Sequence, residues 1–255
     1  SFEWREKSES PRWRQVWLWV NAVGSTGIAL IWGIGLSNLL HGVPLDSDGN
    51  YAGDFWDLFT GYTLLGGIAF VLLFAFHGAS YLTVRTTGDL CERARRAART
   101  LAIPAVAVVA GYVIWTVAVA VDRNDKDVFP PVLPAAIAIA AIALAAFVVY
   151  AGRSGLAFAL SAIGTLGLVA TLFISLYPRV MVSSPDFANS LTVSGTASAH
   201  YTLAVMSVVA LIVTPLVLLY QGWTYYVFRA RVTGGETPRD EQAQPPPEPA
   251  TGAAP

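Results

Sequence analysis

Charged residues are scarce in this chain of 255 residues: they make up 13% of it, whereas a soluble globular domain contains roughly 25%. Apolar residues account for 55%. So few charges cannot cover a water-facing surface, which excludes a soluble enzyme of this length. The 16 Lys and Arg residues are balanced by 17 Asp and Glu residues, and without a basic excess nucleic acid is not expected as a partner. The composition indicates an integral membrane protein.

Cysteine and catalytic motifs are also missing. Cys91 is the only cysteine, which excludes a disulfide framework, a four-cysteine zinc site and a CxxCH haem attachment. The sequence contains no GxxxxGK, no GxGxxG following a strand, no HExxH and no GxSxG. No catalytic residue, cofactor-binding residue or metal ligand can therefore be assigned from a motif.

The sequence contains long uncharged runs instead of catalytic motifs. A helix needs about 20 apolar residues to cross the hydrocarbon core of a bilayer, and six runs reach that length. We predict an all-α integral membrane protein whose six transmembrane helices lie at residues 16–40, 58–84, 101–121, 128–152, 154–178 and 199–228. Residues 1–15 form a short segment before the first helix, and residues 229–255 form a Pro-rich tail that we expect to be disordered.

Basic residues and aromatic residues orient these helices. Thirteen of the 16 basic residues fall on one side of the predicted membrane, and the positive-inside rule then places both chain termini in the cytoplasm. Several aromatic residues near the span ends are expected to form an interfacial belt. They are Trp56, Tyr62, Tyr177, Tyr201, Trp223, Tyr225 and Tyr226.

Two connections between spans are informative. Residues 152–154 form a very tight turn, so the two helices that flank it should pack as an antiparallel hairpin through their small residues. Residues 85–100 are predicted to form a short surface helix with an excess of arginine. Its positive charge could contact anionic lipid headgroups, or it could simply be solvated, and the sequence leaves both interpretations open.

The three histidines are the residues that could hold a haem. His41 and His200 both lie at the outer end of a span, whereas His77 lies inside one. Ionisable groups within a membrane are costly and often functional. The alternative, which we favour for each histidine, is a neutral ring that hydrogen-bonds to neighbouring groups. Asn38, near the end of the first span, is a further candidate for a buried polar position.

Several segments resemble subunit II of the cytochrome bd-type quinol oxidases. NLLHGVP at residues 38–44 is similar to the N-L-L-x-G-V-P signature of that family, and HGASYL at residues 77–82, which contains Ser80 and Tyr81, resembles its next helix. YPRVM at residues 177–181 resembles its outer loop. The order and spacing of these fragments are what make the resemblance specific.

The resemblance implies a nine-helix subunit built from two four-helix bundles and a peripheral helix, in a bacterial plasma membrane. It implies a heterodimer in which subunit I carries haems b and d, oxidises quinol and reduces dioxygen to water, while subunit II stabilises it and binds no haem. A structural quinone, membrane lipid and a small accessory subunit are compatible with this assignment. The chain corresponds to the family from the end of its third helix onward, so we expect the first two helices and most of the third to be missing. The alternatives are a haem-free scaffold of another complex and a secondary transporter, although no internal repeat supports a transporter.

Overall fold

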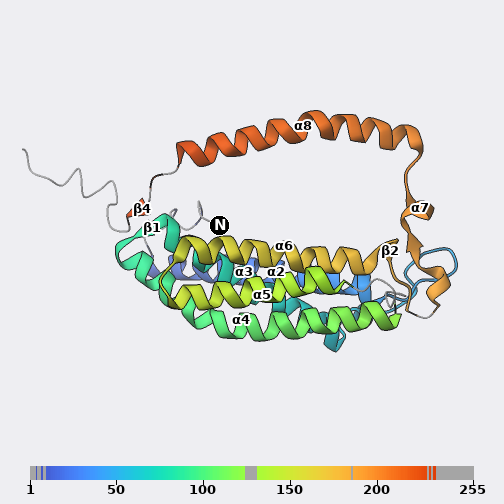
Figure 1. Cartoon of the computed structure of the whole chain (residues 1–255), viewed down its shortest axis with the longest axis horizontal. Coiled ribbons are helices and arrows are strands. Elements are labelled where there is room, and N and C mark those ends of the chain that lie inside the picture. The colour runs from blue at the N-terminus through green and yellow to red at the C-terminus, as the bar shows by residue number, and fades with distance from the viewer. Residues whose placement is uncertain are drawn as a thin grey trace, which may run out of the picture.

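The computed structural model describes residues 4, 7, 10–123, 131–184, 186–228, 230 and 232–233. Within this part of the chain, six helices are long and apolar enough to cross a membrane. They are α2 (Pro11–His41), α3 (Gly61–Arg85), α4 (Gly88–Arg123), α5 (Val132–Tyr150), α6 (Ser154–Leu176) and α8 (His200–Val227). The protein is therefore an all-α integral membrane protein (Figure 1).

The remaining elements are short and lie at the two ends of the bundle. One end carries β1 (Thr86–Thr87), which pairs in parallel with β4 (Val232–Thr233). The other end carries an antiparallel pair, β2 and β3, together with two 3-10 turns and a one-turn helix. These elements are β2 (Arg179–Met181), β3 (Leu191–Thr192), η1 (Phe55–Leu58), η2 (Phe187–Asn189) and α7 (Val193–Thr196).

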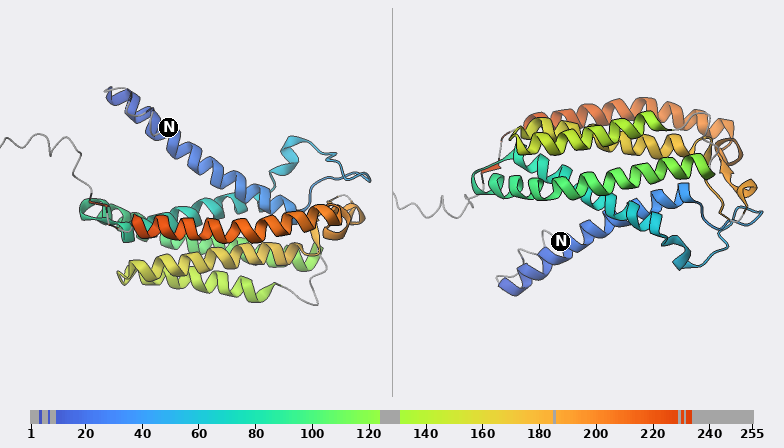
Figure 2. Two further views of the ribbon diagram at one scale, coloured as in Figure 1. Left: turned by 90° about the horizontal axis from the view of Figure 1, so that it is seen from above. Right: turned by 60° about the horizontal axis from the view of Figure 1, so that its bottom comes forward.

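Helices α3, α4, α5 and α6 form the bundle that contains most of the core. Leu73, Val109, Ile142 and Leu168 are almost completely buried within it. The α5–α6 hairpin expected from the tight turn is present, and Gly152 adopts a positive φ of 78° in that turn. Helix α2 packs on α3 and crosses the bundle obliquely, so that its first half diverges from the other helices (Figure 2).

Glycines allow the closest helix contacts. A Cβ atom added to Gly33 of α2 would lie 2.5 Å from the carbonyl oxygen of Gly66 in α3, and one added to Gly67 would lie 2.8 Å from Leu30. Across the hairpin, a Cβ atom on Gly167 would lie 2.9 Å from the backbone nitrogen of Ala138. Because helices in lipid associate through close packing rather than through hydrophobic exclusion of water, these contacts fix the position of α2 on α3 and of α5 on α6.

Helix α4 is longer than the apolar run that it contains. The segment expected to be a separate surface helix continues without a break into the span, from Gly88 to Arg123. Ala and Arg are strong helix formers, and Asp89 in the first turn interacts favourably with the helix dipole. No residue ends the helix between its charged part and its apolar part. Pro104, further along, lies within the helix and does not interrupt it.

One expected member of the aromatic belt is misplaced. Tyr62 retains 1% of its accessible surface, so it belongs to the core rather than to the membrane interface. The belt prediction was wrong at this position because Tyr62, the second residue of α3, faces α4, where its hydroxyl has a partner in Thr116. The other belt residues are exposed.

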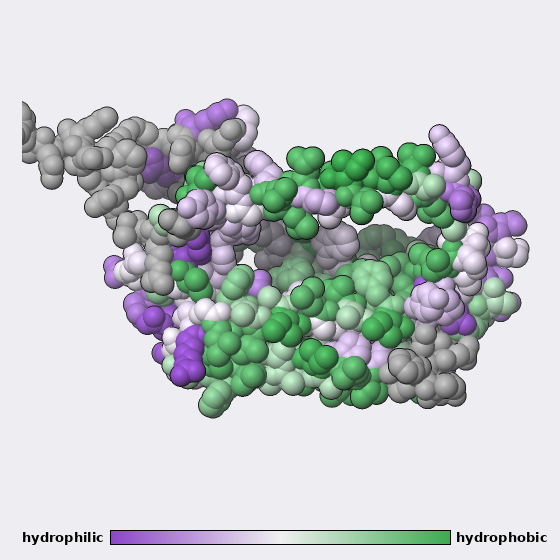
Figure 3. Space-filling model, turned by 45° about the horizontal axis from the view of Figure 1, so that its top comes forward, coloured by the Kyte–Doolittle hydropathy of each residue, from purple (hydrophilic) through white to green (hydrophobic). Residues whose placement is uncertain are grey.

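Helix α8 stands apart from the bundle, which matches the peripheral helix implied by the resemblance. The most apolar stretch of α8 has no buried residue, and Figure 3 shows an open hollow between α8 and the bundle. Its two ends are nevertheless connected to the bundle ends. The Arg85 guanidinium donates a hydrogen bond to the Phe228 carbonyl next to the β1–β4 pair. The predicted disordered tail and the loop that precedes α5 lie largely outside the described residues.

Candidate functional site

A cavity of about 710 Å³ opens where α2 ends, beneath the loop that follows it. Backbone hydrogen bonds order this region: Val43 N–H donates to Val182 O and Ser184 N–H donates to Val43 O, both at 3.0 Å. The loop 42–60 and the loop after α6 therefore form one layer over the end of α2. The cavity lining is almost entirely apolar and consists of Ile31, Ile34, Gly35, Asn38, Leu39, Val43, Leu45, Gly49, Tyr51, Phe55, Leu58, Phe59, Met181 and Leu191.

Asn38 is the polar residue that α2 contributes to this cavity. Its Nδ2 donates to Ile34 O at 3.0 Å and to Leu58 O at 2.9 Å. Both amide protons are then used, which fixes the orientation of the amide group. The Oδ1 atom is buried and has no hydrogen-bond partner. An unsatisfied buried acceptor is unfavourable, and this oxygen is not accessible from the cavity in the structure.

Tyr51 lies at the edge of the same cavity, outside the membrane-spanning helices. Its hydroxyl donates to the carbonyl oxygen of Asp54 at 2.6 Å. Partial loss of water around the hydroxyl and the negative charges of Asp57 and Asp54 raise the pKa of Tyr51 above its ordinary value. Tyr51 therefore remains a neutral donor at neutral pH and holds the loop in place over the cavity.

Beside the cavity, hydroxyl groups connect α2, α3 and α4 inside the bundle. The Ser37 and Tyr112 hydroxyl oxygens are 2.7 Å apart, and those of Tyr62 and Thr116 are 2.9 Å apart. The rings of Tyr62 and Tyr112 lie 5.4 Å from each other, and the His41 ring stacks on Tyr62 at the same distance. His41 is thus part of a packed aromatic cluster at the end of α2.

A second polar contact joins α3 to α6, in the half of the bundle that contains the arginine-rich start of α4. His77 Nδ1 lies 2.8 Å from the Ser161 hydroxyl. The His77 ring stacks on Phe158 with a centroid distance of 4.7 Å, and Tyr81 contacts the same phenylalanine at 5.4 Å. Ser80 instead donates to Phe76 O within its own helix.

The structure thus groups the predicted polar residues in three places. Asn38 and His41 lie at the end of α2, His77 and Tyr81 meet around Phe158, and His200 is the exposed first residue of α8. Within the described residues, no group of three or more His, Cys, Asp and Glu side chains is arranged to hold a metal ion.

Apart from His77, the side chains that form hydrogen bonds between helices were not predicted to do so from the sequence. They are hydroxyl-bearing residues on apolar helices, namely Ser37, Tyr62, Tyr112, Thr116 and Ser161. The four-residue spacing of Tyr112 and Thr116 places them on one face of α4. This spacing was the sequence signal that could have indicated a polar contact with a neighbouring helix.

These features define a multi-pass helical membrane protein whose internal polar side chains form hydrogen bonds to backbone carbonyls and, at a few places, to one another across helices. Comparison with known proteins identifies the family. Residues 1–228 match the family model described as cytochrome bd terminal oxidase subunit II. The chain belongs to this family, and it is therefore a subunit of a respiratory terminal oxidase that assembles with subunit I. This assignment replaces the two alternatives, a scaffold of another complex and a secondary transporter.

Individual relatives agree with the family model. The chain is 36% identical over 237 residues to the cytochrome bd ubiquinol oxidase subunit 2 of Bacillus subtilis (strain 168), which covers 92% of the chain and 70% of that relative. It is 30% identical over 271 residues to the cytochrome bd-I ubiquinol oxidase subunit 2 of Escherichia coli (strain K12), with 94% and 72% covered. A probable cytochrome oxidase subunit 2 of Haemophilus influenzae is also 30% identical, over 256 residues.

Proposed function

We propose that this chain is the haem-free subunit of its oxidase and that it stabilises subunit I, which carries haems b and d, oxidises quinol and reduces dioxygen to water. The observation that supports this proposal is that polar side chains inside the bundle are hydrogen-bonded to one another across helices, as in the pairs Ser37–Tyr112 and His77–Ser161. Side chains used in this way fix the helix packing and are not arranged around a reacting molecule.

The positions of the histidines also support a haem-free role. A haem with two histidine ligands needs both at one depth on facing helices. His77 lies in the opposite half of the bundle from His41, and His200 lies on the helix that stands apart from the bundle. The ring faces of His41 and His77 are packed against Tyr62 and Phe158 respectively.

The test is the haem spectrum of the complete oxidase. Purified complexes that carry His41→Gln, His77→Gln or His200→Gln should keep the haem b and haem d absorbance bands and the ratio of haem to protein of the unmodified complex. Glutamine retains hydrogen bonding but cannot replace an imidazole as an axial ligand. Loss of one haem band in a variant that still contains both subunits would overturn the proposal.

A second role is suggested by the cavity at the end of α2: we propose that it holds a structural quinone. A quinone has an apolar body that fits this almost entirely apolar lining.

Two glycines of α2 allow a matched test of this second role. Gly35 lines the cavity whereas Gly24 does not, and a Cβ atom on either glycine would meet no other atom within 4 Å. Gly35→Leu should fill part of the cavity and remove about one quinone per complex from a solvent extract, whereas Gly24→Leu should retain it. Equal quinone content in both variants would contradict the proposal.

We further propose that the protein lies in a bacterial plasma membrane with the arginine-rich start of α4 and both chain ends in the cytoplasm. The support is the distribution of basic residues, of which Arg93, Arg95, Arg96 and Arg99 lie at one end of the bundle.

A further inference from the structure

The first third of α4 extends beyond the thickness of a membrane. Helix α4 has 36 residues and is therefore about 54 Å long at 1.5 Å per residue, whereas the hydrocarbon core of a bilayer is about 30 Å thick. The extra length is the part that precedes Leu101. It contains Arg93, Arg95, Arg96 and Arg99, against two acidic residues, Asp89 and Glu92. From this length and charge we infer that this part of α4 lies at the level of the lipid headgroups.

The four arginines are of two kinds. Arg93 and Arg96 are exposed, whereas Arg95 and Arg99 are half-buried and, four residues apart, share one face of the helix. The Nε atoms of Arg95 and Arg99 are inaccessible to solvent and have no hydrogen-bond partner. The Nη atoms are not buried in this way, so a ligand can reach these two side chains only through the ends of their guanidinium groups.

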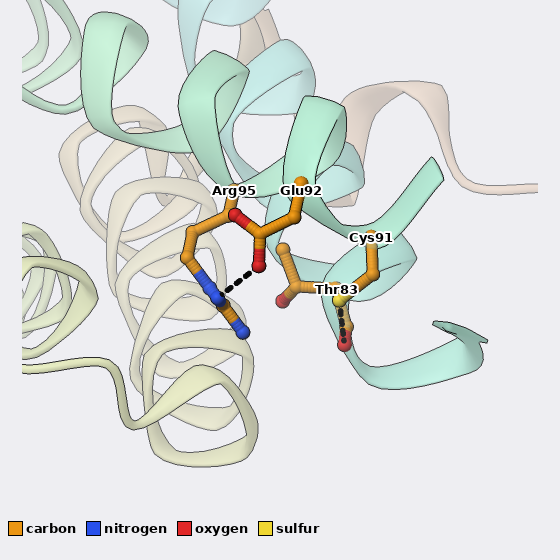
Figure 4. Close-up of polar contacts among 4 residues, drawn as sticks. All are labelled: Thr83, Cys91, Glu92 and Arg95. Atoms are coloured by element: carbon orange, nitrogen blue, oxygen red, sulfur yellow. Dashed lines mark hydrogen bonds and ion pairs between the residues drawn. The ribbon is translucent and has the colours of Figure 1, made fainter. Parts of the chain in front are cut away.

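Neighbouring groups occupy only one of these Nη atoms. Glu92 binds the Nη1 atom of Arg95 at 2.6 Å (Figure 4). No ion pair or side-chain hydrogen bond joins Arg99 to another described residue; the contact of Tyr150 is to the Arg99 backbone carbonyl, at 2.9 Å. The last carbonyls of α5 are also taken, since the N–H groups of residues 151–153 donate to those of residues 147–149.

Apolar surface continues directly from this basic pair toward the middle of the membrane. Ile103 lies one turn beyond Arg99 on the same face of α4 and is 68% exposed. Phe147 lies one turn before Tyr150 on α5 and is 71% exposed. A ligand that binds the arginines therefore meets uncovered apolar side chains on two adjacent helices immediately below its charged group.

We propose that Arg95 and Arg99 bind the phosphate of an anionic membrane phospholipid whose acyl chains lie along Ile103 and Phe147. A guanidinium group binds phosphate through parallel N–H donors, and the Nη–H groups that remain unpaired on Arg99 and Arg95 supply such donors. The apolar continuation favours a lipid over a soluble anion, because only a lipid covers both surfaces at once.

The experiment uses the complete oxidase in detergent, titrated with phosphatidylglycerol in mixed micelles. Retained lipid is counted by native mass spectrometry. The double variant Arg95→Gln/Arg99→Gln should weaken phosphatidylglycerol binding by about thirtyfold, as expected for two basic residues at an anionic headgroup. The matched control Arg93→Gln/Arg96→Gln removes the same charge from the exposed face of the same helix and should change binding by less than about threefold. Phosphatidylcholine should bind much more weakly to every form.

Each other outcome overturns the proposal. Equal losses in the two double variants would mean that the charge acts only diffusely, and no loss in Arg95→Gln/Arg99→Gln would place the lipid elsewhere. Displacement by inorganic phosphate at a concentration equal to that of the lipid would identify a soluble-anion site. If the glutamine variant fails to assemble, Arg95→Lys/Arg99→Lys keeps the charge but not the parallel donors. It should weaken binding by about tenfold, and unchanged binding would contradict the proposed geometry.

Discussion

The hydroxyl oxygens of Ser37 and Tyr112 lie 2.7 Å apart and join α2 to α4 across the interior of the protein. Both side chains are almost completely buried. Ser37 also donates to Gly33 O at 2.6 Å, so in that arrangement Tyr112 is the donor to Ser37. This contact holds α2, which crosses the bundle obliquely, against α4. The first of four predictions tests its contribution to stability.

Tyr112→Phe removes the donor and leaves the ring in place. We expect the free energy of unfolding to fall by about 1 kcal/mol, the size of an interhelical hydrogen bond in a membrane. Thermal inactivation of the purified oxidase measures this change. Tyr220→Phe, on the exposed face of α8, is the control and should be neutral. If both variants are neutral, the contact contributes nothing to stability.

A glycine substitution tests the packing of α2 on α3. Gly33→Ala places a methyl group against the Gly66 carbonyl, which is backbone and cannot move aside, so we expect a loss of about 1–3 kcal/mol in stability. Gly27→Ala on the same helix meets no atom within 4 Å and should be neutral or slightly stabilising, because alanine favours a helix. Equal stability of the two variants would show that the α2–α3 contact is looser than described.

His77 is predicted to stabilise the bundle through its bond to Ser161. His77→Gln should leave assembly, haem content and turnover close to those of the unmodified oxidase. His77→Leu should lower stability by about 1 kcal/mol, and not more, because Ser161 still donates to Phe158 O at 2.8 Å. The control His200→Leu changes an exposed residue. A fall in turnover of tenfold or more in His77→Gln, with normal assembly, would indicate a catalytic role instead.

Membrane orientation can be tested with a single cysteine on α4, but Cys91 is not the best position for it (Figure 4). The thiol is partly covered and lies 3.6 Å from Thr83 O, so a reagent reaches it slowly. Cys91→Ser combined with Ala97→Cys moves the thiol to an exposed position on α4. A membrane-impermeant maleimide should label this variant in inside-out vesicles and not in intact cells. Labelling in intact cells would reverse the proposed orientation.

The six membrane-spanning helices could be predicted because each depends on a local property, a long uncharged run. The true length of α4 could not, because hydropathy detects only the apolar part, whereas the helix continues through a charged segment of good helix formers. Tyr62 was misplaced for a related reason: closeness to a span end does not tell which way a side chain points.

The candidate site was less predictable than the helices. Asn38 and His77 could be singled out because polar groups are rare in apolar spans. Their partners could not, because the contact between His77 and Ser161 joins residues 84 positions apart in the chain, and its existence depends on which faces of α3 and α6 meet. The cavity beside Asn38 depends likewise on how two loops pair over the end of α2.

The parallel pairing of Thr86 with Val232 constrains the order of events during biosynthesis. The ribosome makes α4, α5, α6 and α8 between these two residues, so Val232 emerges only after all four helices have been synthesised. Contacts between such distant positions are also slow to form, because a long loop must close first. The pairing can therefore form only after α8 has entered the bilayer, and it distinguishes a fully inserted subunit from one whose translocation is incomplete.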